Sequence, residues 1–259
     1  MQPEHLRLDI ESRLAIVRLN RPAARNALSR ALMRELTTCA RDLAERTDID
    51  VVILAGDEKC LTAGADLKDA VAWADDTLST VERREIAGAG FRMCKAWEEM
   101  PQITIVAIEG FAVGGGLALS LACDWRVLAD DAFVSLPEIA PGIPLTWGTI
   151  PRLVNLLGPA KAKRLTILCE RFNAADALGI GLIDYVAPKG GALTRARAVA
   201  AQTLAMPAAA AVRMSKESAN TAATALNHAT GYMAHDQIAF ASASPESRAA
   251  RAAALKPKA

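Results

Sequence analysis

A helix that looks apolar on every side constrains the fold of this chain more than any other feature. Residues 103–108 are a run of branched apolar residues of strand length, and the triplet Gly114-Gly115-Gly116 follows before the apolar stretch 117–122. A helix without a polar face belongs in the interior, where other elements cover it. The chain must therefore build a large core around this strand, glycine triplet and helix.

Apolar runs of strand length alternate with segments of helical periodicity along the chain. The predicted strands are short runs of branched apolar residues: 14–19, 51–55, 103–108, 127–128, 133–136 and 183–186. A helix with Ser29 as its N-cap, ending at Arg46, separates the first two strands in a β-α-β arrangement. A charged helix is predicted over 66–100, where Pro101 ends it. This pattern predicts an α/β fold.

The part of the chain after Pro144 is predicted to be helical, apart from the strand at 183–186. The C-terminal third is rich in alanine and contains amphipathic segments at 193–204, 208–226 and 232–241. Small apolar helix surfaces of this kind often pack on another subunit. Because no fixed-period repeat or Gly/Ser linker interrupts the chain, we expect a core of residues 1–190 with a helical appendix of residues 191–259.

Composition argues against several classes of function. Lys plus Arg is 30 and Asp plus Glu is 29, and the net charge of +1 disfavours nucleic acid or an anionic membrane as the main partner. No apolar run approaches the ~18–20 residues of a membrane span, and the first residues lack the layout of a signal peptide, so a cytoplasmic protein is expected. The five cysteines never form C-x-x-C. We therefore expect reduced thiols and no metal site.

Two loops of small residues follow strands and can expose backbone N–H groups. The first is 62–67, with the sequence T-A-G-A-D-L, and the second is the glycine triplet, whose amides lie at the positive end of the helix dipole. If the loops converge, two N–H donors could stabilise one developing oxyanion. A glycine triplet before a helix also serves close packing or phosphate binding. The spacing matches neither nucleotide-binding glycine motif, and the nucleophile motif G-x-S-x-G is absent.

A single glutamate, Glu138, follows the strand at 133–136 and has almost no polar neighbours in the sequence. Desolvation of such a carboxyl raises its pKa and prepares it to move protons near neutral pH. The alternative is an ordinary loop carboxylate that accepts hydrogen bonds from backbone amides.

Several motifs occur in a fixed order along nearly the whole chain: 20–22, 26–28, 62–67, 110–116, 122–126, 137–138, 174–183 and 244–255. Together they resemble the crotonase superfamily, the enoyl-CoA hydratases and isomerases. The resemblance implies a spiral of β-β-α turns over 1–190, which holds the acyl-CoA site, and a helical trimerisation region over 191–259. It implies a homotrimer or a dimer of trimers, an acyl-CoA thioester substrate, and no cofactor besides the coenzyme A of the substrate.

The resemblance also implies site residues. The oxyanion donors fall on the backbone N–H groups of Ala63 and Gly115, and Glu138 is the catalytic acid/base. Arg25 is a candidate for a phosphate of coenzyme A, and Asp66 is also expected to cap the following helix. The residues implied at the substrate and coenzyme A are Ala24, Arg25, Ala27, Ala65, Asp66, Leu67, Gly114, Pro137, Thr146 and Trp147.

Two positions depart from patterns within this superfamily. Hydratases of the two-glutamate type carry their first carboxylate where this chain has Ala118, and some members carry an aspartate where it has Thr146. Glu109 is a distant candidate for a second carboxylate. A single glutamate suits isomerisation of a 3-enoyl-CoA to a 2-enoyl-CoA, whereas hydration through Glu138 alone is favoured by the family. Another crotonase-type reaction and a catalytically silent acyl-CoA-binding protein stay open.

Overall fold

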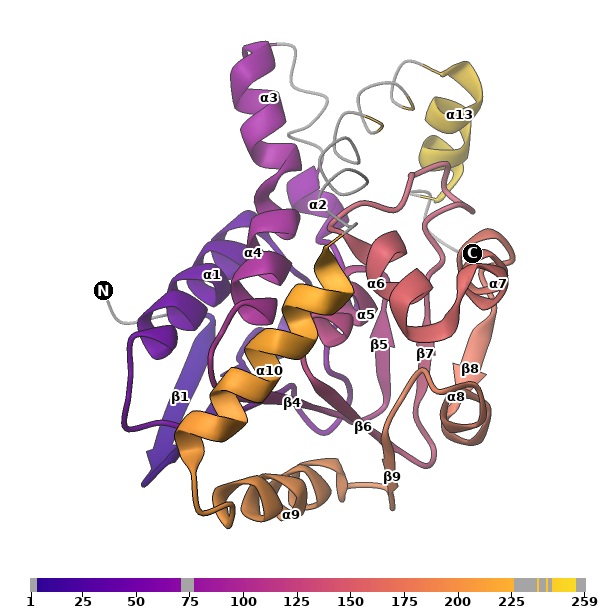
Figure 1. The fold of residues 1–259 in the computed structure, drawn as a ribbon. Coiled ribbons are helices and arrows are strands. Elements are labelled where there is room, and N and C mark those ends of the chain that lie inside the picture. Colours follow the sequence, from indigo (N-terminus) through magenta and orange to yellow (C-terminus); the bar gives the residue numbers. More distant parts are fainter. Residues whose placement is uncertain (1–3, 71–76, 226–236, 238–240, 242–243, 255–259) are drawn as a thin grey trace.

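The computed structural model describes residues 4–70, 77–225, 237, 241 and 244–254, and it has an α/β architecture (Figure 1). A six-stranded sheet has the order β1-β2-β3-β4-β6-β9, in which only the β1–β2 pair is antiparallel. Its strands are β1 Leu6–Glu11, β2 Leu14–Leu19, β3 Val51–Ala55, β4 Ile103–Ile108, β6 Trp125–Ala129 and β9 Tyr185–Ala187. A second sheet has the order β5-β7-β8, with β5 Phe111–Val113, β7 Phe133–Ser135 and β8 Arg171–Asn173.

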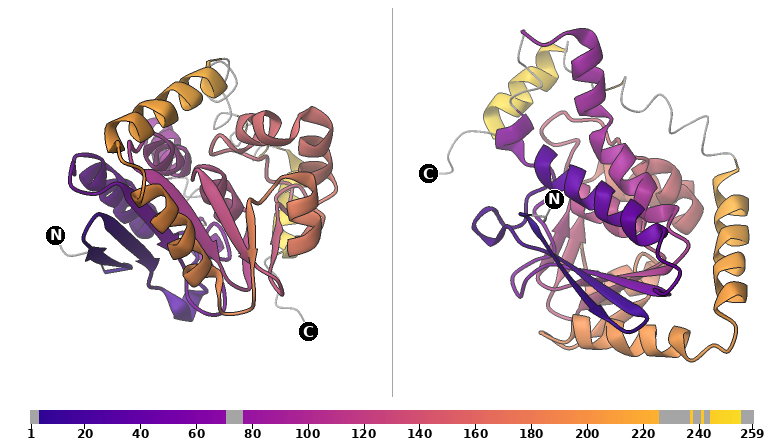
Figure 2. Two further views of the ribbon diagram at one scale, coloured as in Figure 1. Left: turned by 60° about the horizontal axis from the view of Figure 1, so that its bottom comes forward. Right: turned by 90° about the vertical axis from the view of Figure 1, so that its left-hand side faces the viewer.

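Helices cover both faces of the large sheet (Figure 2). Alternate residues of β3 face opposite ways: Val52 and Leu54 pack in the core with helices α1 (Arg30–Ala44) and α4 (Ala89–Glu98), while Ile53 packs in the core with α9 (Ala192–Leu204). Strands β3 and β4 are therefore buried along their whole length. This explains their continuous apolar sequence, as expected for parallel strands covered on both faces.

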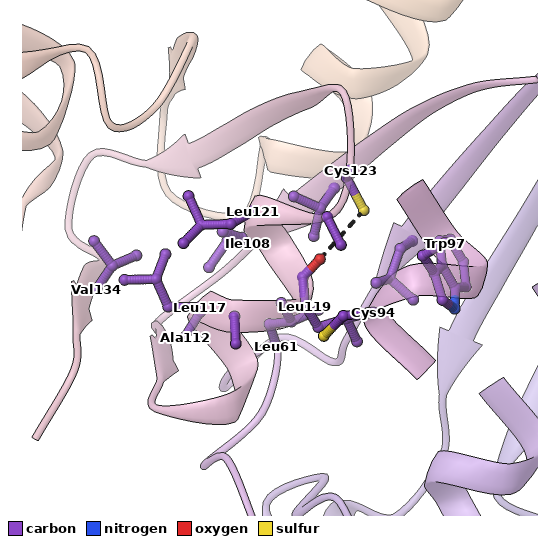
Figure 3. Close-up of a cluster of buried hydrophobic side chains, with 14 of the residues drawn as sticks. Leu61, Cys94, Trp97, Ile108, Ala112, Leu117, Leu119, Leu121, Cys123 and Val134 are labelled. Atoms are coloured by element: carbon purple, nitrogen blue, oxygen red, sulfur yellow. Dashed lines mark hydrogen bonds between the residues drawn. The ribbon is translucent and has the colours of Figure 1, made fainter. Parts of the chain in front are cut away.

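The remaining helices are the 3₁₀-helix η1 Pro22–Ala24 and the α-helices α2 Leu67–Ala70, α3 Thr80–Ala87, α5 Gly115–Leu121, α6 Thr149–Leu157, α7 Pro159–Ile167, α8 Ala174–Ile180, α10 Ala209–Thr224 and α13 Pro245–Ala254. Every residue of α5 is buried. Figure 3 shows the side chains around it, with Trp97 and Cys94 of α4 on one side and Val134 of β7 on the other. The expectation that this helix lies inside the core is confirmed.

Most sequence-predicted elements are present with small shifts. The strands predicted at 14–19, 51–55 and 103–108 match β2, β3 and β4, and Ser29 caps α1 by accepting a hydrogen bond from the N–H of Leu32. The strand predicted at 183–186 lies instead at β9. Almost all of the segment predicted at 232–241 falls outside the described residues.

Three predictions about secondary structure were wrong. The helix expected over 66–100 is divided, because Ser79 starts α3 with a capping box and Gly88 separates α3 from α4. The strand β8 lies in the region after Pro144 that was expected to be helical. Strands β1 and β5 were also missed, although Leu6, Leu8 and Ile10 alternate with polar residues along β1 in the pattern of a strand.

The helix α10 is joined to the body of the protein by polar contacts. The Nζ atom of Lys216 lies 2.6 Å from Oδ2 of Asp124 and 2.7 Å from the backbone oxygen of Gln102. Cavities of about 660 and 560 Å³ lie beside the helix, and Met214 on its surface is 66% exposed. The helix therefore contacts the body through polar groups and leaves part of its own surface uncovered in the single chain.

Candidate active site

The two glycine loops identified in the sequence lie against each other. Isolated β-bridges join Thr62 to Ala112 and Leu28 to Ala65. Gly64 has a φ of +88°, and a Cβ atom added to it would lie 2.5 Å from the backbone oxygen of Val113 and 3.2 Å from the backbone nitrogen of Gly115. Only glycine tolerates both the dihedral angle and this approach. The convergence of the loops expected from the sequence is thus found in the structure.

The hydrogen bonds of this region correct the expected pair of N–H donors. The N–H of Ala63 donates to the backbone oxygen of Arg25 at 3.0 Å, so it is already engaged within the protein. In the neighbouring bridge, the N–H of Leu28 donates to the backbone oxygen of Gly64, and the backbone oxygen of Leu28 accepts from the N–H of Asp66. The N–H of Ala65, which lies between these two residues, takes no part in the bridge. No acceptor among the described residues pairs with the N–H of Ala65 or Gly115.

Gly115 is the first residue of α5, where a helix leaves its N–H groups without an intrahelical partner. The positive end of the helix dipole lies at the same place. Gly64 lies in close contact with the nitrogen of Gly115, and Ala65 directly follows Gly64 in the chain. The two unpaired donors therefore lie in adjoining segments. Ala65, predicted only as a substrate contact, is therefore the better candidate for the second donor, and Ala63 is not.

Glu138 lies directly over the glycine triplet. It follows β7 and Pro137, and a Cβ atom added to Gly114 would lie 2.4 Å from its Oε1 atom. Gly114 has a φ of +55°, so its conformation and the close carboxyl both require glycine. The chain thus brings Glu138 beside Gly115, although they are distant in the sequence.

The environment of Glu138 suits a group that moves protons. Its Oε2 atom is buried and has no hydrogen-bond partner among the described residues. Burial raises the pKa of this carboxyl to about 7. The sequence-based alternative of a loop carboxylate bonded to backbone amides does not describe Oε2. A carboxyl with a pKa near neutrality can take and return a proton in the same reaction.

The position next to the glycine triplet that carries a second carboxylate in two-glutamate hydratases holds Ala118, which is 2% exposed. Glu109 does not replace it. Its carboxylate accepts hydrogen bonds from the N–H groups of Gly190 and Ala192 at 3.0 and 2.8 Å, where α9 begins. Glu109 therefore caps α9, and this candidate for a second carboxylate is wrong.

The segment 24–28 lies beside the first loop, through the bridge from Leu28 to Ala65. This brings Ala24, Arg25 and Ala27 close to the convergent loops, with the side chain of Arg25 exposed. The Arg25 backbone has a φ of +50° and turns the chain at the end of η1. An exposed guanidinium at this position is available to an anionic ligand.

The residues that follow the first loop have different surroundings. Asp66 accepts a hydrogen bond from the N–H of Lys68 at 3.1 Å, which confirms its expected role as a cap, and its other oxygen pairs with Arg21 at 3.0 Å. Leu67 is 44% exposed and presents an apolar surface next to Ala65.

Trp147 lies against Gly115, and Thr146 precedes it in the loop that leads to α6. Thr146 is half-buried and its backbone oxygen accepts hydrogen bonds from the N–H and hydroxyl of Thr149. The indole of Trp147 packs directly against Gly115 and is 6% exposed. This contact between an aromatic ring and the N–H donor residue had no signal in the sequence, because it depends on the path of the loop between β7 and α6.

Two further features bear on the kinds of ligand the protein can bind. Within the described ranges, no group of three or more His, Cys, Asp or Glu side chains lies close enough to hold a metal ion. No helix in the described part of the chain is long and apolar enough to cross a membrane.

Comparisons with known proteins find similar chains over most of the sequence. A model of the enoyl-CoA hydratase/isomerase family matches residues 9–252. A Mycobacterium bovis protein named a probable enoyl-CoA hydratase is 35% identical over 225 residues, which are 86% of this chain and 83% of that protein. The crotonyl-CoA hydratase of Syntrophomonas wolfei is 33% identical over 221 residues, which are 85% of this chain and 83% of that protein.

A crystal structure of an enoyl-CoA hydratase/isomerase from Pseudoalteromonas atlantica has the same fold. It superposes with a TM-score of 0.87, covering 99% of this chain and 98% of the other, at 24% sequence identity.

Proposed function

Because this chain belongs to the enoyl-CoA hydratase/isomerase family and has the crotonase fold, we propose that it is an enoyl-CoA isomerase in which Glu138 alone carries the proton. The observation that supports this proposal is the position of Glu138. Its buried, unpaired Oε2 atom belongs to a carboxyl that lies over Gly114, next to two unpaired backbone N–H groups. Such a site holds one base and an oxyanion hole, which is what a double-bond shift requires.

In the proposed reaction, the thioester oxygen of a 3-enoyl-CoA accepts hydrogen bonds from the N–H groups of Ala65 and Gly115. The carboxylate of Glu138 removes a proton from C2, and the electron pair moves onto the thioester oxygen as an enolate. The same carboxyl then returns the proton to C4, so that the double bond lies between C2 and C3. The enolate is stabilised by the two donors and by the dipole of α5.

Coenzyme A is proposed to lie along the segment 24–27 and the end of the first loop. Ala24 and Ala27 leave room for the backbone to approach the ligand, and the exposed Arg25 is the cation for a phosphate. Leu67 offers apolar surface at the same edge of the site, beside Asp66. The donors Ala65 and Gly115 then receive the thioester from this side.

Hydration of a 2-enoyl-CoA is the second candidate, since the relatives described above are named hydratases. Addition of water needs one group to take a proton from water and a group to give a proton to C2. Ala118 can do neither, so Glu138 would have to perform both steps. This is why we favour isomerisation.

Mass spectrometry in oxygen-18 water tests the proposal against this alternative. We expect the purified protein to convert a 3-enoyl-CoA to the 2-enoyl-CoA with no gain in mass. If a 2-enoyl-CoA instead gains labelled oxygen from the water, and no double bond is shifted, the protein is a hydratase. If both substrates bind and neither changes, the protein is a silent acyl-CoA-binding homologue or catalyses another reaction of this superfamily.

The raised pKa of Glu138 predicts the pH dependence of the isomerisation. The carboxylate is the active base, and burial raises its pKa from the usual value of 4.5 to about 7. Below this pKa the group is mostly protonated, so kcat/KM should rise about tenfold per pH unit and level off above about pH 7. Measurement of kcat/KM between about pH 5 and pH 9 checks this, because kcat/KM reports the free enzyme. An inflection near 4.5 instead would mean that Glu138 is not desolvated.

Assembly through residues 191–259 is the remaining part of the proposal. The family resemblance implies a homotrimer or a dimer of trimers. The exposed Met206 and Met214 and the mostly apolar cavity of about 660 Å³ beside α10 support it, because these apolar surfaces are uncovered in the single chain.

A further inference from the structure

The indole of Trp147 fills the space between two glycines on different helices. A Cβ atom added to Gly115, at the start of α5, would lie 2.1 Å from the Cζ3 atom of the indole. A Cβ atom added to Gly90, in α4, would lie 2.0 Å from its Cε2 atom. The ring can occupy this place only because both residues lack a side chain. It therefore lies between α4 and Gly115, the residue proposed to carry an oxyanion donor.

The backbone of Trp147 is held in a strained conformation. Its φ is +60°, in the left-handed region that is unfavourable for a non-glycine residue, and Gly148 follows with a φ of +71°. Arg152 donates from Nη1 to the backbone oxygen of Trp147 at 2.8 Å. The other nitrogens of this guanidinium bind both carboxylate oxygens of Glu98 in α4, at 2.8 and 2.7 Å.

A bulky residue kept in a strained conformation by a buried bidentate ion pair indicates a constraint other than stability. Arg152 and Glu98 fix the direction of the loop, and the loop fixes the indole. The backbone is thus held by hydrogen bonds, and the ring itself is confined by its packing between Gly90 and Gly115.

In the proposed binding mode, the ring lies on the acyl side of the reaction centre. The coenzyme A end of the substrate is proposed to lie along 24–27 and the first loop, and we place the acyl chain on the opposite side of the thioester, where Gly115 and the indole lie. The indole packs on Gly115 itself and is buried. An acyl chain that starts at the Gly115 N–H therefore meets the ring after only a few carbons.

We propose that the indole of Trp147 ends the acyl site and restricts the protein to short-chain enoyl thioesters. This inference rests on the proposed function, because it takes the thioester to be held at Ala65 and Gly115. It adds the substrate class: unbranched acyl groups of butenoyl size bind, and groups of decenoyl size are excluded by the ring.

The experiment compares Trp147→Leu with a matched control, Trp125→Leu. Trp125 lies in β6 and lines the cavity beside α10, remote from the glycine loops. For each protein, calorimetry gives the Kd of butyryl-CoA and of decanoyl-CoA. Leucine removes most of the ring, so the ratio of the two Kd values should move at least about tenfold in favour of decanoyl-CoA, with no movement in the control.

Wild-type binding across a series of saturated acyl-CoA esters serves as a second measurement that needs no variant. The affinity should be highest for short acyl chains of about butyryl size and should fall as the acyl chain lengthens toward decanoyl. Affinity that rises steadily to decanoyl-CoA, or a Trp147→Leu variant that is folded by circular dichroism and keeps the wild-type ratio, would overturn the inference.

Binding and turnover separate this inference from the proposed function. Saturated esters cannot isomerise, so their Kd values are independent of the reaction. If the double-bond shift is absent but the Kd ratio changes as expected, the isomerase proposal fails and the role of Trp147 stands. If the double-bond shift occurs but the Kd ratio does not change, the isomerase proposal stands and the role of Trp147 fails.

Discussion

Replacement of Glu138 by glutamine is expected to lower kcat for the double-bond shift by about 10³-fold while leaving the Kd of acyl-CoA esters unchanged within about twofold. The amide has nearly the shape of the carboxyl but cannot accept a proton at neutral pH. Glu138 lies over Gly114 with its Oε2 atom unpaired, so no other carboxylate in the described site can take over. Steady-state kinetics and calorimetry on the same preparation measure both quantities.

Glu109→Gln is the matched control for this variant. Glu109 is the glutamate closest in sequence to the glycine triplet, but its carboxylate caps α9 through Gly190 and Ala192. The control should keep the wild-type kcat and lose some stability. Full activity in Glu138→Gln would show that the proton is moved by another group, and it would remove the basis of the isomerase mechanism.

The same variant has a consequence for stability that does not depend on turnover. The folded-state pKa of Glu138 is raised to about 7 from 4.5, so the fold favours the protonated carboxyl. Stability from this group is fully present below the unfolded pKa and is lost as the pH rises through the folded pKa. Urea unfolding at about pH 5 and about pH 8 should therefore show Glu138→Gln gaining stability relative to wild type at the higher pH.

Removal of a single backbone N–H at Ala65 is expected to lower kcat by about 10²–10³-fold, the usual effect of losing one oxyanion donor. An amide-to-ester replacement at this residue deletes the donor and keeps the methyl side chain and the path of the chain. The proposed enolate would then keep one donor, Gly115. Single-turnover kinetics isolate the chemical step in the semisynthetic protein.

The same replacement at Ala63 separates the two candidate donors. The N–H of Ala63 donates to the backbone oxygen of Arg25, so its removal should cost about 1 kcal/mol of stability and leave kcat unchanged. If instead the ester at Ala63 slowed the reaction and the ester at Ala65 did not, the original expectation from the sequence would be restored. Thermal unfolding of both proteins provides the stability comparison.

The core of this fold could be predicted from the sequence because burial leaves a pattern in it. Strands β3 and β4 are covered on both faces and therefore read as unbroken apolar runs, and the fully buried α5 reads as a helix without a polar face. Strand β8 has only three residues, too few for a distinct apolar pattern. Strand β1 alternates Leu6, Leu8 and Ile10 with polar residues, a strand signal that the prediction left out, and most of the strand is exposed.

The residues of the site were recognisable for a similar reason. Glycines that must approach another backbone, and a carboxyl among apolar residues, depart from local rules, so the sequence marked the two loops and Glu138 as candidates, and the resemblance to the crotonase superfamily implied their roles. The sequence also determined that Ala118 offers no second carboxylate, because that depends only on the type of residue.

Only the tertiary structure decided which groups are free to act. Whether the N–H of Ala63 or of Ala65 is unpaired depends on Arg25, and the fate of Glu109 depends on the start of α9. The indole of Trp147 meets Gly90 and Gly115 because separate helices converge on it. Residue type and spacing determine what a group can donate or accept, whereas its partners come from segments far apart in the chain, and they become known only once those segments are packed together.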